Sequence, residues 1–174
     1  MMTLRCTRRL LGYFDEKLRR DVGAEPVECL LGDWYANLVW YGSTSMTLCI
    51  NGLTRYAIVI PLEDCETTHA LYIRVAQRTY DAIRRVGAPQ AIARRVLDEY
   101  RGGVSIEPTN NRSILGTMND LAKHLISHLE QRLRSGPVRD PADLDDDLNI
   151  IPHRPLNWSN ARERLLAVCH SANA

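Results

Sequence analysis

The chain has 174 residues, of which 45% are hydrophobic and 25% charged, and its formal net charge is +1. These values are typical of one globular domain with a sizeable core, and they exclude collagen-like, low-complexity and largely disordered chains. No apolar stretch reaches the roughly 18 residues of a membrane helix, and the balanced charge argues against a dedicated nucleic-acid-binding protein.

The cysteines indicate the redox compartment. None of them forms a C-x-x-C pair, so no zinc or thioredoxin-like motif is present. Residues 1–11 carry too many charges for a secretory signal peptide. We therefore expect a cytoplasmic protein with reduced thiols and no membrane association. The cysteines are Cys6, Cys29, Cys49, Cys65 and Cys169.

The first part of the chain predicts a strand, a helix and a three-strand meander. Their expected ranges are 3–7, 8–21, 34–41, 46–51 and 55–62. The Asn51-Gly52 dipeptide favours a tight hairpin turn, because both residues tolerate positive φ. The segment 34–41 is apolar on both faces, which indicates a central strand covered on both sides.

The second part predicts mainly helices. Helical spacing of apolar residues indicates helices over 68–85, 89–100 and 113–133, with a strand over 104–107 and a short last helix over 161–169. The segment 136–157 is rich in proline and aspartate and is interpreted as an exposed, solvated arm.

This order of elements predicts an α+β fold. We expect a mostly antiparallel sheet of about five strands, with the meander at its centre and four to five helices packed on one face. Residues 1–135 would form a single domain. Residues 136–174 would form a Pro/Asp-rich arm and a short C-terminal helix, packed on that domain or trailing it.

Two segments stand out as motifs, LGDWYANL over 31–38 and TNNRSILGTMND over 109–120. Through them the chain resembles a family of uncharacterised bacterial proteins, and a similar run occurs in proteins resembling plasmid-encoded reading frames. The resemblance covers roughly residues 3–133. It implies a bacterial protein of the mobile-element kind, but no activity and no catalytic residue.

The second motif predicts a helix start, where unpaired N–H groups and the helix dipole favour anions. Arg112 could add a bidentate donor for a carboxylate or phosphate. The structural alternative is that Asn111 caps the helix and Arg112 pairs with Asp33. If the two motifs meet, they would form a polar binding cleft. Its candidate residues are Asp33, Trp34, Asn37, Asn111, Arg112, Ser113, Asn119 and Asp120.

Gly116 lies in the first turns of the predicted helix, where glycine costs about 1 kcal/mol relative to alanine. We expect it to allow the close approach of another backbone or of a large ring such as Trp34.

His124 and His128 are spaced i, i+4, which suits a metal site on one helical face, and Asp120 precedes them on the same flank. The spacing lacks the intervening glutamate of metalloproteases, and a hydrogen-bonded flank is the commoner use of such residues. They are weak metal candidates, and the sequence predicts no metal and no cofactor.

Arg74, Arg78 and Arg85 fall on one side of the helix over 68–85. Such a face could contact nucleic acid, an acidic protein partner or the chain's own aspartates over 143–147, or it could simply be solvated. The excess of arginine over lysine could serve recognition of an anionic ligand or reflect codon usage. The sequence gives no indication of the oligomeric state.

No complete catalytic constellation can be assembled, so no catalytic residue is assigned. We expect a small binding or accessory protein that works through the polar cleft of the two motifs. One alternative is a hydrolase or nuclease-like enzyme using Asp33, Asn111, Arg112 and His124. The other is a nucleic-acid-associated regulator of mobile-element or toxin–antitoxin type.

Overall fold

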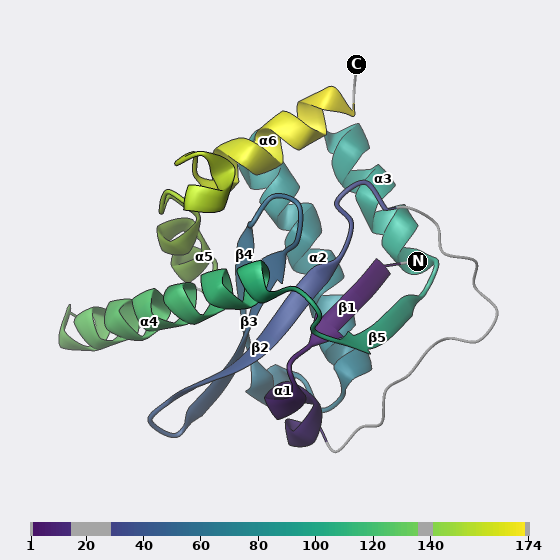
Figure 1. Ribbon diagram of the computed structural model, residues 1–174. Helices are drawn as coiled ribbons and strands as arrows, with labels where there is room; N and C mark the ends of the chain where they lie inside the picture. Colours follow the sequence, from purple (N-terminus) through teal and green to yellow (C-terminus); the bar gives the residue numbers. More distant parts are fainter. Residues whose placement is uncertain (1, 15–28, 136–140, 173–174) are drawn as a thin grey trace.

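A computed structural model of the protein describes residues 2–14, 29–135 and 141–172 and shows a five-stranded sheet between two layers of helices (Figure 1). The strands are β1 (Met2–Cys6), β2 (Trp34–Tyr41), β3 (Thr44–Asn51), β4 (Ala57–Pro61) and β5 (Val104–Pro108). The helices of the described residues are α1 (Arg8–Tyr13), α2 (Thr68–Arg85), α3 (Gln90–Arg101), α4 (Arg112–Ser135), α5 (Pro141–Asn149) and α6 (Ala161–Ser171).

The sheet is mixed, with the strand order β4-β3-β2-β1-β5. Short connections join β2, β3 and β4, and these strands pair antiparallel, as predicted for the meander. In contrast, β1 pairs parallel to both β2 and β5. The prediction of a mostly antiparallel sheet is therefore wrong, although the α+β class is confirmed. Helical segments separate β1 and β5 from the meander, and connections of that length permit parallel pairing.

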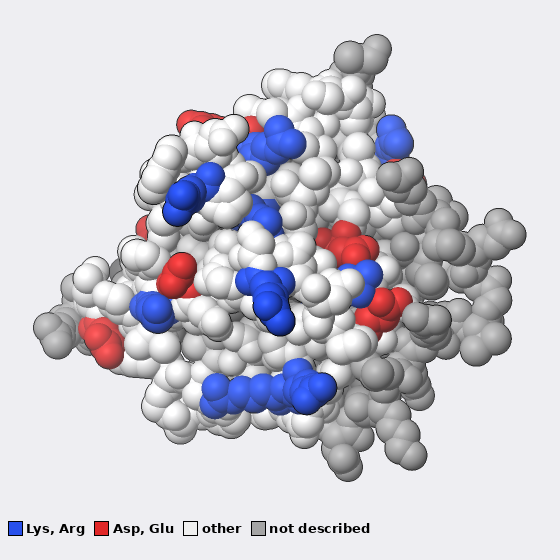
Figure 2. Space-filling view, in the orientation of Figure 1, with Lys and Arg blue, Asp and Glu red and all other residues white. Residues whose placement is uncertain are grey.

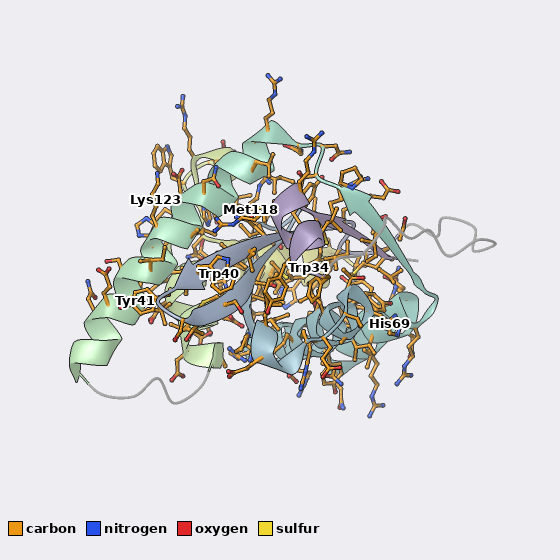
Figure 3. The ribbon with its side chains drawn as sticks, turned by 90° about the horizontal axis from the view of Figure 1, so that it is seen from below. Trp34, Trp40, Tyr41, His69, Met118 and Lys123 are labelled. Atoms are coloured by element: carbon orange, nitrogen blue, oxygen red, sulfur yellow. The ribbon has the colours of Figure 1, made fainter. Side chains whose placement is uncertain are left out.

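Both faces of the sheet are covered, so the expectation of helices on one face only is also wrong. Alternate residues of β2 enter two separate cores, because successive side chains point to opposite faces. Trp34 belongs to the core under α2, α3 and α6, whereas Met118 of α4 belongs to the core under α4 and α5 (Figure 3). The central, doubly covered position predicted for residues 34–41 is confirmed.

The helix boundaries follow from local capping. Thr67 and Asn160 have extended backbones, and their side chains accept hydrogen bonds from the N–H groups of Ala70 and Glu163. The predicted helix over 8–21 begins as expected at Arg8 and extends to Tyr13, and its last residues lie outside the described part. None of the described helices is long and apolar enough to span a membrane.

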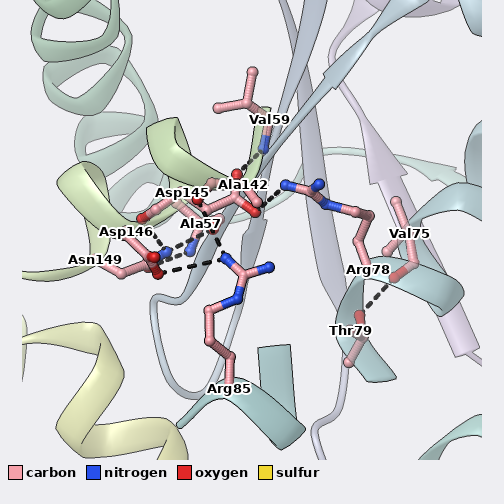
Figure 4. A network of polar contacts seen from close by, with 10 residues as sticks. All are labelled: Ala57, Val59, Val75, Arg78, Thr79, Arg85, Ala142, Asp145, Asp146 and Asn149. Atoms are coloured by element: carbon pink, nitrogen blue, oxygen red, sulfur yellow. Dashed lines mark hydrogen bonds and ion pairs between the residues drawn. The ribbon is translucent and has the colours of Figure 1, made fainter. Parts of the chain in front are cut away.

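The largest error concerns the predicted exposed arm, because residues 141–149 form the packed helix α5. Leu144 and Leu148, spaced i, i+4, are buried in the core beside α4. Asp145 is also buried, and its Oδ1 accepts a 2.8 Å hydrogen bond from the Val59 N–H of the edge strand β4 (Figure 4). The acidic segment 141–149 therefore contains an apolar stripe and a buried carboxylate.

Asn149 completes the contact of α5 with the sheet edge. Its Oδ1 accepts a 2.7 Å hydrogen bond from the Ala57 N–H, and its Nδ2 donates at 2.7 Å to the Ala57 carbonyl. The side chain therefore pairs with β4 as a neighbouring strand would, and α5 covers an edge that otherwise presents open hydrogen-bonding groups.

The arginine face of α2 contacts this same helix. Arg78 forms an ion pair with Asp145, and Arg85 lies 3.4 Å from Asp146 and donates to the Ala142 carbonyl (Figure 4). Of the uses considered for this face, docking of the chain's own aspartates is confirmed for Arg78 and Arg85. Arg74 of the same helix is exposed.

Candidate functional site

The two motif segments meet in space, but through other residues than predicted. The Tyr35 hydroxyl donates a 3.2 Å hydrogen bond to Asn110 Oδ1, just before α4 begins. Asp33 forms a 2.7 Å ion pair with Arg5, which also holds Glu107 at 2.7 Å. In the register of the parallel strands, Arg5 stands opposite both Tyr35 and Glu107, which explains the arrangement.

Arg112 does not pair with Asp33, so that structural alternative is wrong. Arg112 is exposed, and no carboxylate in the described ranges lies within ion-pair distance of it. The other half of the alternative is confirmed, because Asn111 caps α4. Its Oδ1 accepts hydrogen bonds from the N–H groups of Ser113 at 3.0 Å and Ile114 at 3.2 Å.

The remaining candidates from the motifs have separate surroundings. Trp34 is only 1% exposed, and its Nε1 donates a 2.8 Å hydrogen bond to the Tyr100 hydroxyl inside the core. Asn37 Oδ1 accepts from Thr7 at 3.0 Å. Asn119 and Asp120 are exposed on α4. The motif residues thus divide into core, cap and surface positions.

The packing role expected for Gly116 is wrong. The residue is exposed, and a Cβ atom built on it would meet nothing within 4 Å. Trp34 lies in the core on the other side of the sheet from α4. The close approach occurs instead at Gly52, where a Cβ would lie 3.1 Å from the Asp33 carbonyl and 3.2 Å from the Tyr35 ring.

The two histidines of α4 have different surroundings. His128 Nδ1 lies 3.5 Å from Asp147 of α5, whereas His124 borders a surface cavity. Within the described ranges, no group of three or more His, Cys, Asp or Glu side chains is arranged to hold a metal ion.

That cavity, here called the α4 cleft, has a volume of about 590 Å³ and lies between α4 and residues 151–155. Its apolar walls are Leu121, Ile151, Pro152 and Pro155. Its polar walls are Thr117, Asp120, Lys123, His124, Ser127, His153 and Arg154. Of the predicted site residues, Asp120 and His124 line it, and the first motif contributes none of its walls.

A smaller cavity of about 260 Å³, here called the β3–β4 pocket, adjoins the α4 cleft at Pro155. It is lined by the turn between β3 and β4, including Arg55, by residues 155–157 and by Arg164 of α6. Together the two cavities present four Lys or Arg side chains and one carboxylate. Figure 2 shows basic side chains gathered over this region, with few acidic groups between them.

His153 lines the α4 cleft. The residue is 8% exposed, and its Nε2 atom has no hydrogen-bond partner among the described residues. Burial lowers the pKa of His153, and the nearby Arg55 and His124 lower it further. The imidazole is therefore neutral at pH 7. With the proton on Nε2 it can donate to a ligand in the cleft.

Arg55 also has a side-chain nitrogen without a hydrogen-bond acceptor among the described residues. Its Nη1 atom is buried and has no hydrogen-bond partner in the described part of the chain, and burial lowers the pKa of its guanidinium. His153 Nε2 and Arg55 Nη1 are thus two buried nitrogens that can each donate a hydrogen bond but have no acceptor among the described residues. A buried polar group without a partner costs on the order of 1–3 kcal/mol, so a ligand that satisfies both would be favoured.

The backbone around the pocket is strained. Arg55, Asn157 and Trp158 have φ values of 62°, 54° and 65°, in the left-handed region that residues other than glycine seldom adopt. Each costs about 1–2 kcal/mol. Such strain is typical of binding sites, where the surrounding structure fixes an unfavourable conformation. The tight turn predicted at Asn51-Gly52 is wrong in detail, because residues 52–56 join β3 to β4 and the positive φ falls on Arg55. No local sequence signal pointed to Arg55, His153 or Arg164.

Comparison with known proteins places the chain in a family. No curated protein matches it significantly. The model of a domain of unknown function, DUF6933, matches residues 3–164. The match reaches past residue 133, the expected limit of the resemblance, and includes α5, both cavities and the start of α6. It confirms the resemblance to a family without an assigned activity. The chain belongs to the family defined by the domain of unknown function DUF6933.

Proposed function

We propose that the protein is a binding protein for a small anionic ligand, which lies across the α4 cleft and the β3–β4 pocket. The observation that carries the proposal is the pair of buried nitrogens, His153 Nε2 and Arg55 Nη1, that lack acceptors among the described residues. An anion bound between them would supply both acceptors. Lys123, Arg154 and Arg164 add positive charge around the same space.

The alternatives from the sequence have less support. A hydrolase using Asp33, Arg112 and His124 would need these groups in one place. Asp33 instead pairs with Arg5, and among the described residues no hydrogen bond or ion pair joins the three. A nucleic-acid-associated regulator would need the arginine face of α2, whose Arg78 and Arg85 contact α5.

Sulfate titration by calorimetry tests the proposal, because sulfate keeps its charge throughout the neutral pH range. We expect wild-type protein to bind sulfate, and Arg55→Gln to weaken the binding about tenfold or more, since a charge-assisted hydrogen bond contributes about 1.5–3 kcal/mol. Arg74→Gln is the matched control, because it removes the same charge from an exposed position on α2.

Arg74→Gln should change the sulfate affinity less than about threefold. His153→Gln serves as a second variant if Arg55→Gln fails to fold. Absence of sulfate binding to the wild type contradicts the proposal. So does an equal loss in the Arg55 and Arg74 variants, because the attraction would then come from the overall charge of the protein.

A further inference from the structure

The two adjoining cavities have different walls, which suggests that they hold different parts of one ligand. The β3–β4 pocket has a volume of about 260 Å³ and is lined by Arg55 and Arg164. The α4 cleft is larger, at about 590 Å³, and mixes apolar walls with hydrogen-bonding groups. A bare inorganic ion would leave most of this space to solvent. Volumes of about 300–1,000 Å³ are typical of sites for organic ligands.

The charges indicate the head group. Arg55 and Arg164 can each offer paired N–H donors to a tetrahedral oxyanion, and His153 Nε2 of the adjoining α4 cleft is a third donor. Two guanidinium charges match a dianion better than a single carboxylate. The head group that fits best is therefore a phosphate.

The walls of the α4 cleft indicate the body of the ligand. Asp120 would accept hydrogen bonds from hydroxyl groups and repel a second anionic group. No Phe, Tyr or Trp ring is present among the described residues that line the cleft, whereas nucleobases are usually held by aromatic stacking. A hydroxylated body fits these walls better than a base.

We infer that the ligand is a small phosphomonoester with a hydroxylated body, a sugar phosphate in its chemistry, with its phosphate in the β3–β4 pocket and its body in the α4 cleft. This inference rests on the proposed function, which requires only that an anion binds. It adds the identity of the head group and the direction in which the rest of the molecule extends.

The test compares inorganic phosphate, ribose 5-phosphate and ribose by calorimetry with the full chain. We expect ribose 5-phosphate to bind about tenfold or more tightly than phosphate, and ribose alone to give no binding heat. Arg164→Gln should weaken both phosphate-containing ligands to a similar extent. Arg164 is exposed, so this variant should keep the fold.

Two variants at Ser127 test whether the hydroxylated body of the ligand lies in the α4 cleft. Ser127 is exposed on α4 and lines the cleft, so Ser127→Leu would narrow the cleft without disturbing the core. We expect Ser127→Leu to weaken ribose 5-phosphate about tenfold and leave phosphate unchanged. Ser127→Ala, which adds no bulk, should change the affinity for either ligand less than about threefold.

The outcomes separate the inference from the proposed function. Equal affinities for phosphate and ribose 5-phosphate would overturn the inference and leave the proposed function intact. Tighter binding of adenosine monophosphate than of ribose 5-phosphate would overturn the sugar in favour of a nucleotide. Absence of binding by phosphate, ribose 5-phosphate and sulfate alike would overturn both.

Discussion

At the scale of single residues, Gly52 is closely packed whereas Gly116 faces solvent. A Cβ at Gly52 would press on the Asp33 carbonyl, which belongs to the backbone and is fixed by its 2.8 Å hydrogen bond from the Gly52 N–H. A Cβ at Gly116 would meet nothing within 4 Å. The sequence context of Gly116, inside a helix, suggested a packing role that the structure assigns to the glycine of a turn.

The same substitution at these positions should therefore have opposite effects. We expect Gly52→Ala to lower the free energy of unfolding by about 1–3 kcal/mol, because the backbone must shift to admit the methyl group. Gly116→Ala should raise it by about 0.5–1 kcal/mol, because alanine is the better helix former. Urea unfolding measures both. Destabilisation by Gly116→Ala would show that the glycine is needed where it stands.

At the scale of elements, α5 depends on a buried carboxylate. Burial raises the pKa of Asp145 to about 7, although Arg78 and the Val59 N–H pull it downward. The unfolded chain releases this proton near the ordinary value of 3.8. At pH values between these two pKa values, Asp145 therefore takes up a proton when the chain folds. The contribution of Asp145 to stability is fully present below about pH 3.8 and is lost as the pH rises through about 7.

Asp145→Asn should remove this dependence, because the amide has no proton to take up. We expect the melting temperature of the wild type, relative to that of Asp145→Asn, to be higher at pH 5 than at pH 8. Taking the difference between the two proteins cancels the titration of groups elsewhere, His153 included. If the wild type instead gained on the variant as the pH rose, Asp145 would behave as an ordinary ionised partner of Arg78.

The position of α5 shows what the sequence pattern could not reveal. Leu144 and Leu148 have helical spacing, but three aspartates over 145–147 and flanking prolines made the segment resemble a solvated linker. Its burial depends on partners far along the chain, chiefly Ala57 and Val59 of β4. Local periodicity cannot show a hydrogen bond to an edge strand 86 residues away.

At the scale of the whole molecule, the last two helices complete both cores. Leu144 and Leu148 of α5 fill one core, and Leu165 and Cys169 of α6 fill the other. A chain that ends at residue 135 would expose the surfaces they cover and the edge of β4. We therefore expect the fragment 1–135 to lose cooperative thermal unfolding. A sharp transition close to that of the full chain would show that residues 1–135 form an independent domain.

Within the whole molecule, the sequence predicted single elements well, but it did not predict strand directions or the residues of the proposed site. Strong periodic patterns identified β2, α2 and α4 closely, because each element buries its own apolar stripe. The directions of β1 and β5 could not be read, because pairing depends on long connections rather than on the strand residues. The residues of the proposed site could not be read from the sequence for a similar reason. Arg55, His153 and Arg164 come together only through the packing of α6 and the preceding loop.

The central claim is that an anion binds beside His153, and the titration of this histidine by NMR with and without saturating sulfate tests it most directly. Without sulfate, we expect a pKa below the ordinary value of 6.5, because burial, Arg55 and His124 disfavour the imidazolium. A bound dianion should raise the pKa of His153, since it stabilises the protonated ring. A His153 pKa that sulfate leaves unchanged would contradict the claim.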